Sequence, residues 1–249
     1  MKNIVINDKI YGLNIKPISD DDSYSGKAYR MQIGNDLLAV KIYRTEKLYD
    51  AEEDGEWFPS FEEIQKFNQL SSQVQPILLS NVTVYNEDGD YIGCGSYYVN
   101  ETEGPISNLL FRLPISKFFN DIFKLEESIS LLTKEKIVID DWNTSNIKFG
   151  NITSNPSDER IYAFDDSNYQ ICSDFSCKTV ASFNRECFND LAMDILEDYY
   201  CLIKPDYGEC KTFRNILSKQ SDKFRFLERD SRDYPNIGSY LEDRVKIKK

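Results

Sequence analysis

Histidine is missing from the sequence: none of the 249 residues is a His. Its absence excludes the Ser-His and Cys-His nucleophilic pairs and removes the commonest general acid and base. Six cysteines are present, none in a Cys-x-x-Cys pair, and a zinc site would need thiolates alone at spacings that do not suit one. Any catalysis must therefore use carboxylates, lysine, tyrosine or a bound metal.

Long hydrophobic runs are also missing. No apolar run approaches the roughly 20 residues that a membrane span requires, and the one at residues 4–6 is too short for a signal peptide. The scattered cysteines are typical of reduced thiols that act as small apolar side chains. We therefore expect a cytoplasmic protein, and export by a signal-less route stays open.

Positive charge is scarce, because 30 Lys and Arg residues face 42 Asp and Glu residues, for a formal net charge of −12. A surface this acidic repels nucleic-acid phosphates and anionic membranes, so we expect neither as a partner. It would also repel a nucleotide triphosphate, unless a local lysine and a bound metal reverse the sign inside a cleft. The composition is globular, with 41% hydrophobic residues, and the length allows two lobes.

The first hundred residues are rich in predicted strands. Short apolar and alternating segments predict strands at 4–6, 11–18, 28–33 and 37–43, followed by a hairpin of 77–85 and 91–99. One helix interrupts them, beginning after Pro59-Ser60, with an apolar stripe that includes Ile64 and Phe67. Glu62 and Glu63 lie in its first turn, where acids also suit the helix dipole.

Residues 100–105 form the best linker, and we place a boundary there, between residues 1–104 and 105–249. Beyond it, apolar periodicity predicts helices at 115–134, 188–202, around 213–217 and at 237–245. Short strands are predicted at 137–139, 147–149 and 161–164, the first two as a hairpin, and 168–184 is predicted to be a loop. The predicted class is α+β.

Three side chains suit phosphate chemistry. Asp141 and Asn146 lie in the polar loop between two short strands, where an Asp can accept a hydroxyl proton and an Asn carbonyl can hold Mg²⁺. Lys41 lies inside an apolar strand, where burial of an unpaired ammonium is costly. Each also has a plainer explanation, because Asp and Asn are the usual turn residues and a strand lysine often lies on a solvated edge.

In chain order, five segments resemble motifs of the protein-kinase-like fold. Ala39-Val40-Lys41 resembles the third-strand lysine motif, and Phe61-Glu62-Glu63-Ile64 resembles the start of the C helix. Residues 141–146 resemble the catalytic loop, Phe164-Asp165-Asp166-Ser167 resembles the metal-binding Asp-Phe-Gly, and Asn189-Asp190-Leu191 resembles the start of the F helix, whose Asp buttresses that loop. The resemblance, over about residues 10–202, implies a bilobal fold with an antiparallel β-sheet N-lobe, one C helix and a small, mainly α-helical C-lobe.

The resemblance also implies a cofactor, ATP with Mg²⁺, and a role for each residue. Lys41 would bind phosphate oxygens, held in place by Glu63, with Glu62 as the alternative partner. Asp141 would orient and deprotonate the attacking hydroxyl. Asn146 would ligate Mg²⁺ together with Asp165, or with Asp166 in its place. The remaining nucleotide contacts would come from the turn and the hinge: Ser25, Gly26, Val99 and Glu101.

Departures from the family pattern keep several hypotheses open. Only Gly26 remains of the glycine-rich loop, Ile139-Asp140 replaces the family's His-Arg, and Asn143 stands where the family has a cation. The first hypothesis is an ATP- and Mg²⁺-dependent protein Ser/Thr kinase, with a small-molecule kinase of the aminoglycoside or choline type as its variant. The second is a partner-binding pseudokinase, and the third is an unrelated α+β protein. The acidic surface would suit a basic protein substrate or partner, and the oligomeric state is unknown.

Overall fold

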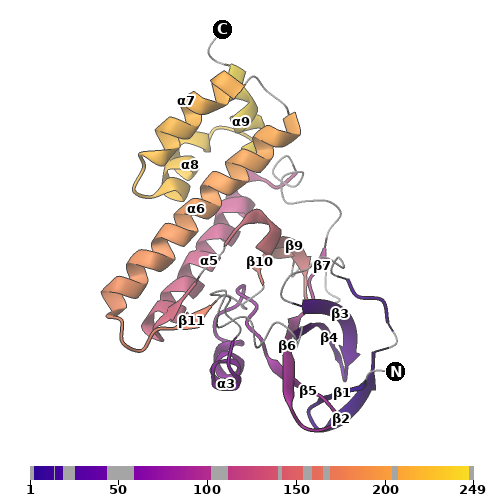
Figure 1. The fold of residues 1–249 in the computed structure, drawn as a ribbon. Helices are drawn as coiled ribbons and strands as arrows, with labels where there is room; N and C mark the ends of the chain where they lie inside the picture. Colours follow the sequence, from indigo (N-terminus) through magenta and orange to yellow (C-terminus); the bar gives the residue numbers. More distant parts are fainter. Residues whose placement is uncertain are drawn as a thin grey trace.

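Figure 1 shows the computed structural model of the protein. The structure describes residues 3–13, 15–18, 26–43, 59–101, 112–139, 142–153, 159–164, 169–203 and 207–246. A strand-rich half lies at one end of the molecule, and a helix-rich half extends away from it (Figure 1). The two short sheets that carry the catalytic-loop-like segment lie between these halves.

A six-stranded antiparallel sheet forms most of the N-terminal half. Its order is β2-β1-β5-β6-β4-β3. The strands are β1 (Asn3–Ile6), β2 (Lys9–Gly12), β3 (Gly26–Ile33), β4 (Asp36–Tyr43), β5 (Val82–Tyr85) and β6 (Tyr91–Tyr97). Alternating apolar residues bury one face of the sheet, where Ile4, Val40 and Val84 are fully buried. Strand β4, which carries Lys41, therefore lies between two hydrogen-bonded neighbours.

Helix α3 (Phe61–Leu70) packs against the other face of the sheet. A capping box starts it: the Ser60 hydroxyl accepts a hydrogen bond from the Glu63 N–H, and the Glu63 carboxylate accepts one from the Ser60 N–H at 2.9 Å. The buried helix residues Ile64 and Phe67 join the same core cluster as Tyr43 of β4. Since side chains alternate along a strand, Lys41 shares the face of Tyr43, toward α3.

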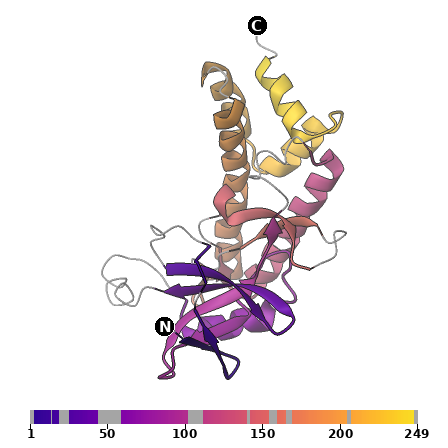
Figure 2. The ribbon, with the colours of Figure 1, turned by 90° about the vertical axis from the view of Figure 1, so that its right-hand side faces the viewer.

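The C-terminal half is mainly helical. Its elements are β7 (Asn100–Glu101), α5 (Ile115–Lys134), β8 (Ile137–Val138), the 3₁₀ turn η1 (Thr144–Asn146), β9 (Ile147–Asn151), β10 (Arg160–Ala163), β11 (Gln170–Ile171), α6 (Cys177–Ile203), α7 (Tyr207–Ser218), α8 (Lys223–Ser231) and α9 (Ile237–Lys246). Helices α5 and α6 pack together, and α7 to α9 gather at the far end (Figures 1 and 2). None of the described helices has an apolar stretch long enough to cross a membrane.

The predicted hairpin of 137–139 and 147–149 is wrong. Strand β8 pairs with β11, whereas β9 lies between β7 and β10 in a different sheet. The apolar pattern identifies a strand but not its partner. The partner of β8 is β11, which lies more than thirty positions further along the chain. The strands on either side of residues 139–146 therefore belong to two different sheets.

Other boundaries also differ from the prediction. The segment 168–184, predicted as a loop, contains β11 and the first eight residues of α6, and helix α8 was not predicted at all. Strand β2 ends at Gly12, and β5 is shorter than the predicted strand 77–85. Asn100 and Glu101 of the predicted linker form β7, while its remainder, 102–105, lies outside the described residues. The boundary at residue 104 stays a prediction.

Several contacts join the two halves. Ile77 forms a parallel bridge with Ala163 at the end of β10, and the Leu78 N–H donates to the Ala163 carbonyl at 2.8 Å. The Ser128 hydroxyl of α5 donates to the Gln75 carbonyl at 3.1 Å. Lys66 of α3 reaches the turn after α5, as described below. These contacts fix the sheet and α3 against the strands that precede residues 165–168.

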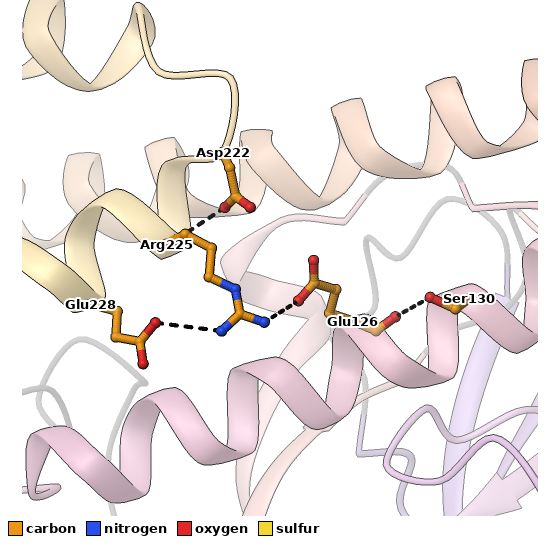
Figure 3. Close-up of polar contacts among 5 residues, drawn as sticks. All are labelled: Glu126, Ser130, Asp222, Arg225 and Glu228. Atoms are coloured by element: carbon orange, nitrogen blue, oxygen red, sulfur yellow. Dashed lines mark hydrogen bonds and ion pairs between the residues drawn. The ribbon is translucent and has the colours of Figure 1, made fainter.

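Helices α5 and α8 meet through Arg225 (Figure 3). Its guanidinium contacts the Glu126 carboxylate at 3.2 Å and the Glu228 carboxylate at 3.4 Å, and it lies 3.5 Å from the centre of the Phe123 ring. Burial raises the pKa of Glu126 above its usual 4.5, an effect that the attraction of Arg225 only partly offsets. The ionised Glu126 is therefore a weak contributor to folding stability.

Replacing Glu126 with Gln should leave the unfolding free energy at pH 7 unchanged, or raise it by less than about 1 kcal/mol. A raised folded-state pKa means that the contribution of Glu126 is full below pH 4.5 and is lost as pH rises through the raised pKa. Urea unfolding of both proteins at several pH values checks this, with Glu228→Gln as the matched loss of an Arg225 partner. A clear loss of stability for Glu126→Gln at pH 7 alone would contradict it.

Candidate active site

The loop after β8 carries the predicted catalytic base. Asp140 and Asp141 lie outside the described residues, but both flanking residues are buried, Ile139 at 2% and Trp142 at 3% exposure. The Trp142 indole N–H donates to the Tyr169 hydroxyl, next to β11. The two ends of the Asp140–Asp141 segment are therefore fixed by core packing and hydrogen bonds.

Asn184 of α6 forms hydrogen bonds with the residues that lead into this loop. Its Oδ1 accepts from the Ile139 N–H at 2.8 Å, and its Nδ2 donates to the Ile137 carbonyl at 3.0 Å and to Thr133 Oγ1 at 2.9 Å. The predicted buttress was Asp190, which is instead exposed, and α6 begins well before it. The prediction chose the wrong residue because α6 starts earlier than its apolar pattern indicates.

Asn143 has a conformational role. It is the N-cap of η1, and its Oδ1 accepts hydrogen bonds from both the N–H of Ser145, at 2.9 Å, and the Ser145 hydroxyl. The next residue, Thr144, donates its hydroxyl to the Asp198 carboxylate of α6. A cation at position 143 could not make this cap, so the departure from the family pattern has a local structural reason.

Asn146, the first predicted magnesium ligand, ends η1 directly before β9. Its carbonyl accepts a hydrogen bond from the Phe164 N–H at 3.0 Å, and the register of β9 and β10 pairs Ile147 with Ala163. Phe164 directly precedes Asp165, the second predicted ligand, which with Asp166 lies outside the described residues. The chain thus brings Asn146 to within one residue of the Asp165 position.

Lys41 lies on β4, paired with Ala28 of β3 and Cys94 of β6. Its side chain is half-buried, so the plain explanation of a solvated edge strand does not apply. Two glycines let the neighbouring strands approach here: a Cβ at Gly93 would lie 2.1 Å from the Lys41 carbonyl oxygen, and one at Gly26 would lie 2.3 Å from that of Ile42. Gly26 is therefore required by strand packing, whatever its role toward a nucleotide.

Glu63, the predicted partner of Lys41, begins α3. Its carboxylate accepts hydrogen bonds from Ser60 and, at 3.4 Å, from the N–H of Ile171 in β11. Burial and the Glu63 charge raise the pKa of the nearby Cys172 thiol. Glu62 is exposed, so Glu63 is the better placed of the two alternatives. Its pairing with Lys41 stays a prediction.

The C-terminal part of α3 is also attached to the helical half. Lys66 Nζ donates to the Glu135 carbonyl at 2.9 Å and lies 3.5 Å from the Glu135 carboxylate. Lys136 Nζ then donates to the Ser173 carbonyl at 2.6 Å, and the Cys172 N–H donates to the Lys136 carbonyl at 2.9 Å. Helix α3 is thus fixed to the turn between α5 and β8, and this turn is itself bonded to the segment that follows β11.

The predicted hinge residues lie where the two halves meet. Val99 is 4% exposed and packs with Leu78 and Tyr162. Glu101 belongs to β7 and pairs with Gly150 of β9, although its side chain is not among those described. Ser25 also lies outside the described residues. Nucleotide binding by these residues stays a prediction.

Metal-binding clusters of the usual kind are not found. In the described part of the chain, no three His, Cys, Asp or Glu side chains gather as a metal site would. The predicted site has a different composition, an Asn amide with an Asp carboxylate, and these hard oxygen ligands suit Mg²⁺. Four cysteines, Cys94, Cys172, Cys177 and Cys187, are thiols rather than disulfides, as predicted.

The sheet, the helix packed on it and the strands that flank the predicted catalytic loop form an α+β arrangement, as predicted. Lys41 lies on the α3 face of the sheet, Glu63 contacts β11, and Asn146 lies beside the end of β10. The predicted order of elements along the chain is confirmed from β3 to α6. Sequence reasoning missed Asn184, which lies in a segment predicted to be a loop, and the Trp142–Tyr169 contact, whose partners are 27 positions apart in the chain.

No family model matches the sequence, and no curated protein matches it either. Among solved structures, the chain is similar to the kinase PK-1 of Cydia pomonella granulovirus, with a TM-score of 0.41 and 16% sequence identity. The match covers 61% of this chain and 50% of that one, so this chain spans about half the length of the viral kinase. So distant a similarity carries no argument about activity, and the functional inference rests on the contacts described above.

Proposed function

We propose that the protein is an ATP- and Mg²⁺-dependent phosphotransferase, specifically a protein Ser/Thr kinase. The observation that carries the proposal is the hydrogen bond of 3.0 Å between the Asn146 carbonyl and the Phe164 N–H. It joins the end of the Asp141–Asn146 loop to the residue before Asp165. Phosphoryl transfer needs few covalent contributions from the protein but requires such ligands to be positioned together.

Each residue then has a defined task. The Lys41 ammonium would bind phosphate oxygens, and Asn146 and Asp165 would hold Mg²⁺ through their side-chain oxygens. Bound Mg²⁺ neutralises negative charge on the phosphates, which a protein of net charge −12 would otherwise repel. Asp141 would orient the attacking hydroxyl and accept its proton, so the reaction needs no histidine.

A protein acceptor is favoured over a small molecule. The chain between β10 and the end of α6 contains no large insertion that could form a closed pocket for an aminoglycoside or choline. The helical half after α6 consists of three short helices. Without such an insertion, a polypeptide segment is favoured as the acceptor over an aminoglycoside or choline.

A second candidate is a pseudokinase that binds a partner. The capping role of Asn143 supports it, because a side chain occupied with Ser145 supplies no cation to a transferring phosphoryl group. The lack of a positive charge at this position is the feature of the loop that weighs against turnover. The two candidates differ in what they predict for nucleotide binding and transfer.

We expect ATP with Mg²⁺ to raise the unfolding free energy by about 2.7 kcal/mol at 100 times its Kd, and ATP with EDTA to do so much less. Lys41→Met should weaken ATP binding about tenfold, since it removes a cation from the phosphates. Lys9→Met, which removes an exposed lysine at the edge of the same sheet, is the matched control and should bind normally. Thermal shift titrations measure all three. If ATP with Mg²⁺ did not shift the melting temperature of the wild-type protein, the partner-binding pseudokinase would be favoured.

A further inference from the structure

A cavity of about 510 Å³ lies between β8, β11 and α6, and we call it the β11–α6 cavity. Its lining includes Ile139 and Trp142, the two residues that flank Asp140 and Asp141 in the chain. Among the residues that the structure describes, none assigned above to ATP or Mg²⁺ lines it. A ligand in this cavity would therefore lie beside the predicted base without occupying the nucleotide site.

The walls of the β11–α6 cavity differ in character. One wall is apolar and comes from Val138, Ile139 and Trp142. At the rim, Phe175 and Phe183 stack with their ring centres 6.0 Å apart and an angle of 22°, and they are 40% and 47% exposed. Two large aromatic rings left this exposed offer a flat surface for a planar or cationic group.

Two carboxylates complete the lining, Glu186 and Asp190, one turn apart on α6. Both residues are exposed, and neither forms an ion pair with a basic side chain in the described part of the chain. Like charges four residues apart on a helix destabilise it slightly. A positively charged ligand would relieve this repulsion, in accord with the net charge of −12.

We propose that the β11–α6 cavity binds an arginine side chain of the protein substrate, close to the hydroxyl that is phosphorylated. Arginine fits all three surfaces: its methylene stem suits the apolar wall, its guanidinium stacks on Phe rings, and the same group pairs with carboxylates. The inference rests on the proposed kinase function and names the substrate class of that site.

The spacing of the acids specifies the sequence around this arginine. Residues four apart on a helix are separated by about 6 Å along its axis, and alternate residues of an extended peptide are separated by about 6.7 Å. An extended segment lying along α6 can therefore pair one basic side chain with Glu186 and another, two positions away, with Asp190. The preferred substrate contains Arg-x-Arg near its Ser or Thr.

The test uses two peptides that differ only in charge, a Ser-containing Arg-x-Arg peptide and its Gln-x-Gln counterpart, with full-length protein. Fluorescence anisotropy without ATP measures binding separately from catalysis. We expect the Arg-x-Arg peptide to bind at least tenfold tighter, and Glu186→Gln or Asp190→Asn to weaken it about tenfold each. Asp88→Asn, the same change in charge at an exposed hairpin turn in the other half, should have no effect.

Transfer kinetics then test whether the cavity binds the peptide substrate. In transfer assays, Glu186→Gln should raise KM for the Arg-x-Arg peptide about tenfold with kcat unchanged, and leave the Gln-x-Gln peptide unaffected. Equal affinity for both peptides, or equal KM in the variants, would overturn the inference while leaving the kinase function intact. Kanamycin, an aminoglycoside, tests the alternative of a small-molecule ligand. If the wild-type protein bound kanamycin but not the Arg-x-Arg peptide, and Glu186→Gln lost the kanamycin binding, the inference would also be overturned. Peptide binding without any phosphoryl transfer would instead contradict the proposed function.

Discussion

Asp141→Asn should lower kcat for phosphoryl transfer by about a thousandfold, because the amide cannot accept the proton of the attacking hydroxyl. The change preserves the shape of the side chain, and it leaves in place the hydrogen bonds of Ile139 and Trp142 on either side. Folding stability should therefore hardly change. The measurement is the initial rate of γ-phosphoryl transfer at saturating ATP and acceptor.

Binding separates this role from a structural one. Asp141→Asn should retain the Mg²⁺-dependent thermal shift with ATP, since Asp141 has no assigned contact with metal or phosphate. Asp88→Asn serves as the charge-matched control and should keep full activity, as it lies in an exposed turn of the other half. If Asp141→Asn retained more than about a tenth of the wild-type kcat, general base catalysis by this residue would be excluded.

Asn184→Ala should lower the unfolding free energy by about 2 to 4 kcal/mol. The substitution leaves the buried Ile139 N–H and Ile137 carbonyl without the bonds of 2.8 and 3.0 Å that Asn184 provides. Unsatisfied buried polar groups cost about 1 to 3 kcal/mol each. The loop that begins at Ile139 would also lose its fixed position, so kcat should fall in addition. Urea unfolding and transfer assays at a temperature where the variant is folded measure the two effects.

A second asparagine of the same helix provides the control. Asn189 is 9% exposed, accepts from the Lys223 N–H at 3.0 Å and donates to the Ser221 carbonyl at 3.3 Å, and these contacts join α6 to the start of α8. Asn189→Ala should therefore lose comparable stability but keep its kcat. Equal kcat values for the two folded variants would show that Asn184 supports the fold and has no separate effect on the loop.

The elements that the sequence predicts well are those with a buried apolar face. Helix α3 shows a clear period of 3.6, and its predicted apolar stripe through Ile64 and Phe67 is buried in the core. The apolar segment 37–43, predicted as a strand, forms β4. The start of α6 escaped prediction because its first ten residues bury only Val180 and Asn184. Without an apolar stripe, the segment has no period to detect.

Long-range partners could not be predicted at all. The pattern at 137–139 indicates a strand, but the partner of β8 is β11, chosen by packing rather than by a turn. The family resemblance assigned the support of the loop to Asp190, whereas Asn184, six positions earlier, makes the hydrogen bonds to it. The sequence pattern correctly placed Lys41 on a strand and Glu63 in the first turn of a helix, whereas their roles toward a nucleotide stay predictions. The hydrogen bonds of Asn143 and Asn184 became visible only in three dimensions.

The most direct test of the central claim is transfer of the labelled γ-phosphoryl group from ATP to Ser or Thr by the purified wild-type protein. We predict Mg²⁺-dependent labelling that is abolished by Lys41→Met and by Asp165→Ala, and phosphoserine or phosphothreonine on hydrolysis of the acceptor. Labelling that survives both substitutions, or its absence despite tight Mg²⁺-dependent ATP binding, would contradict the assignment as a protein Ser/Thr kinase.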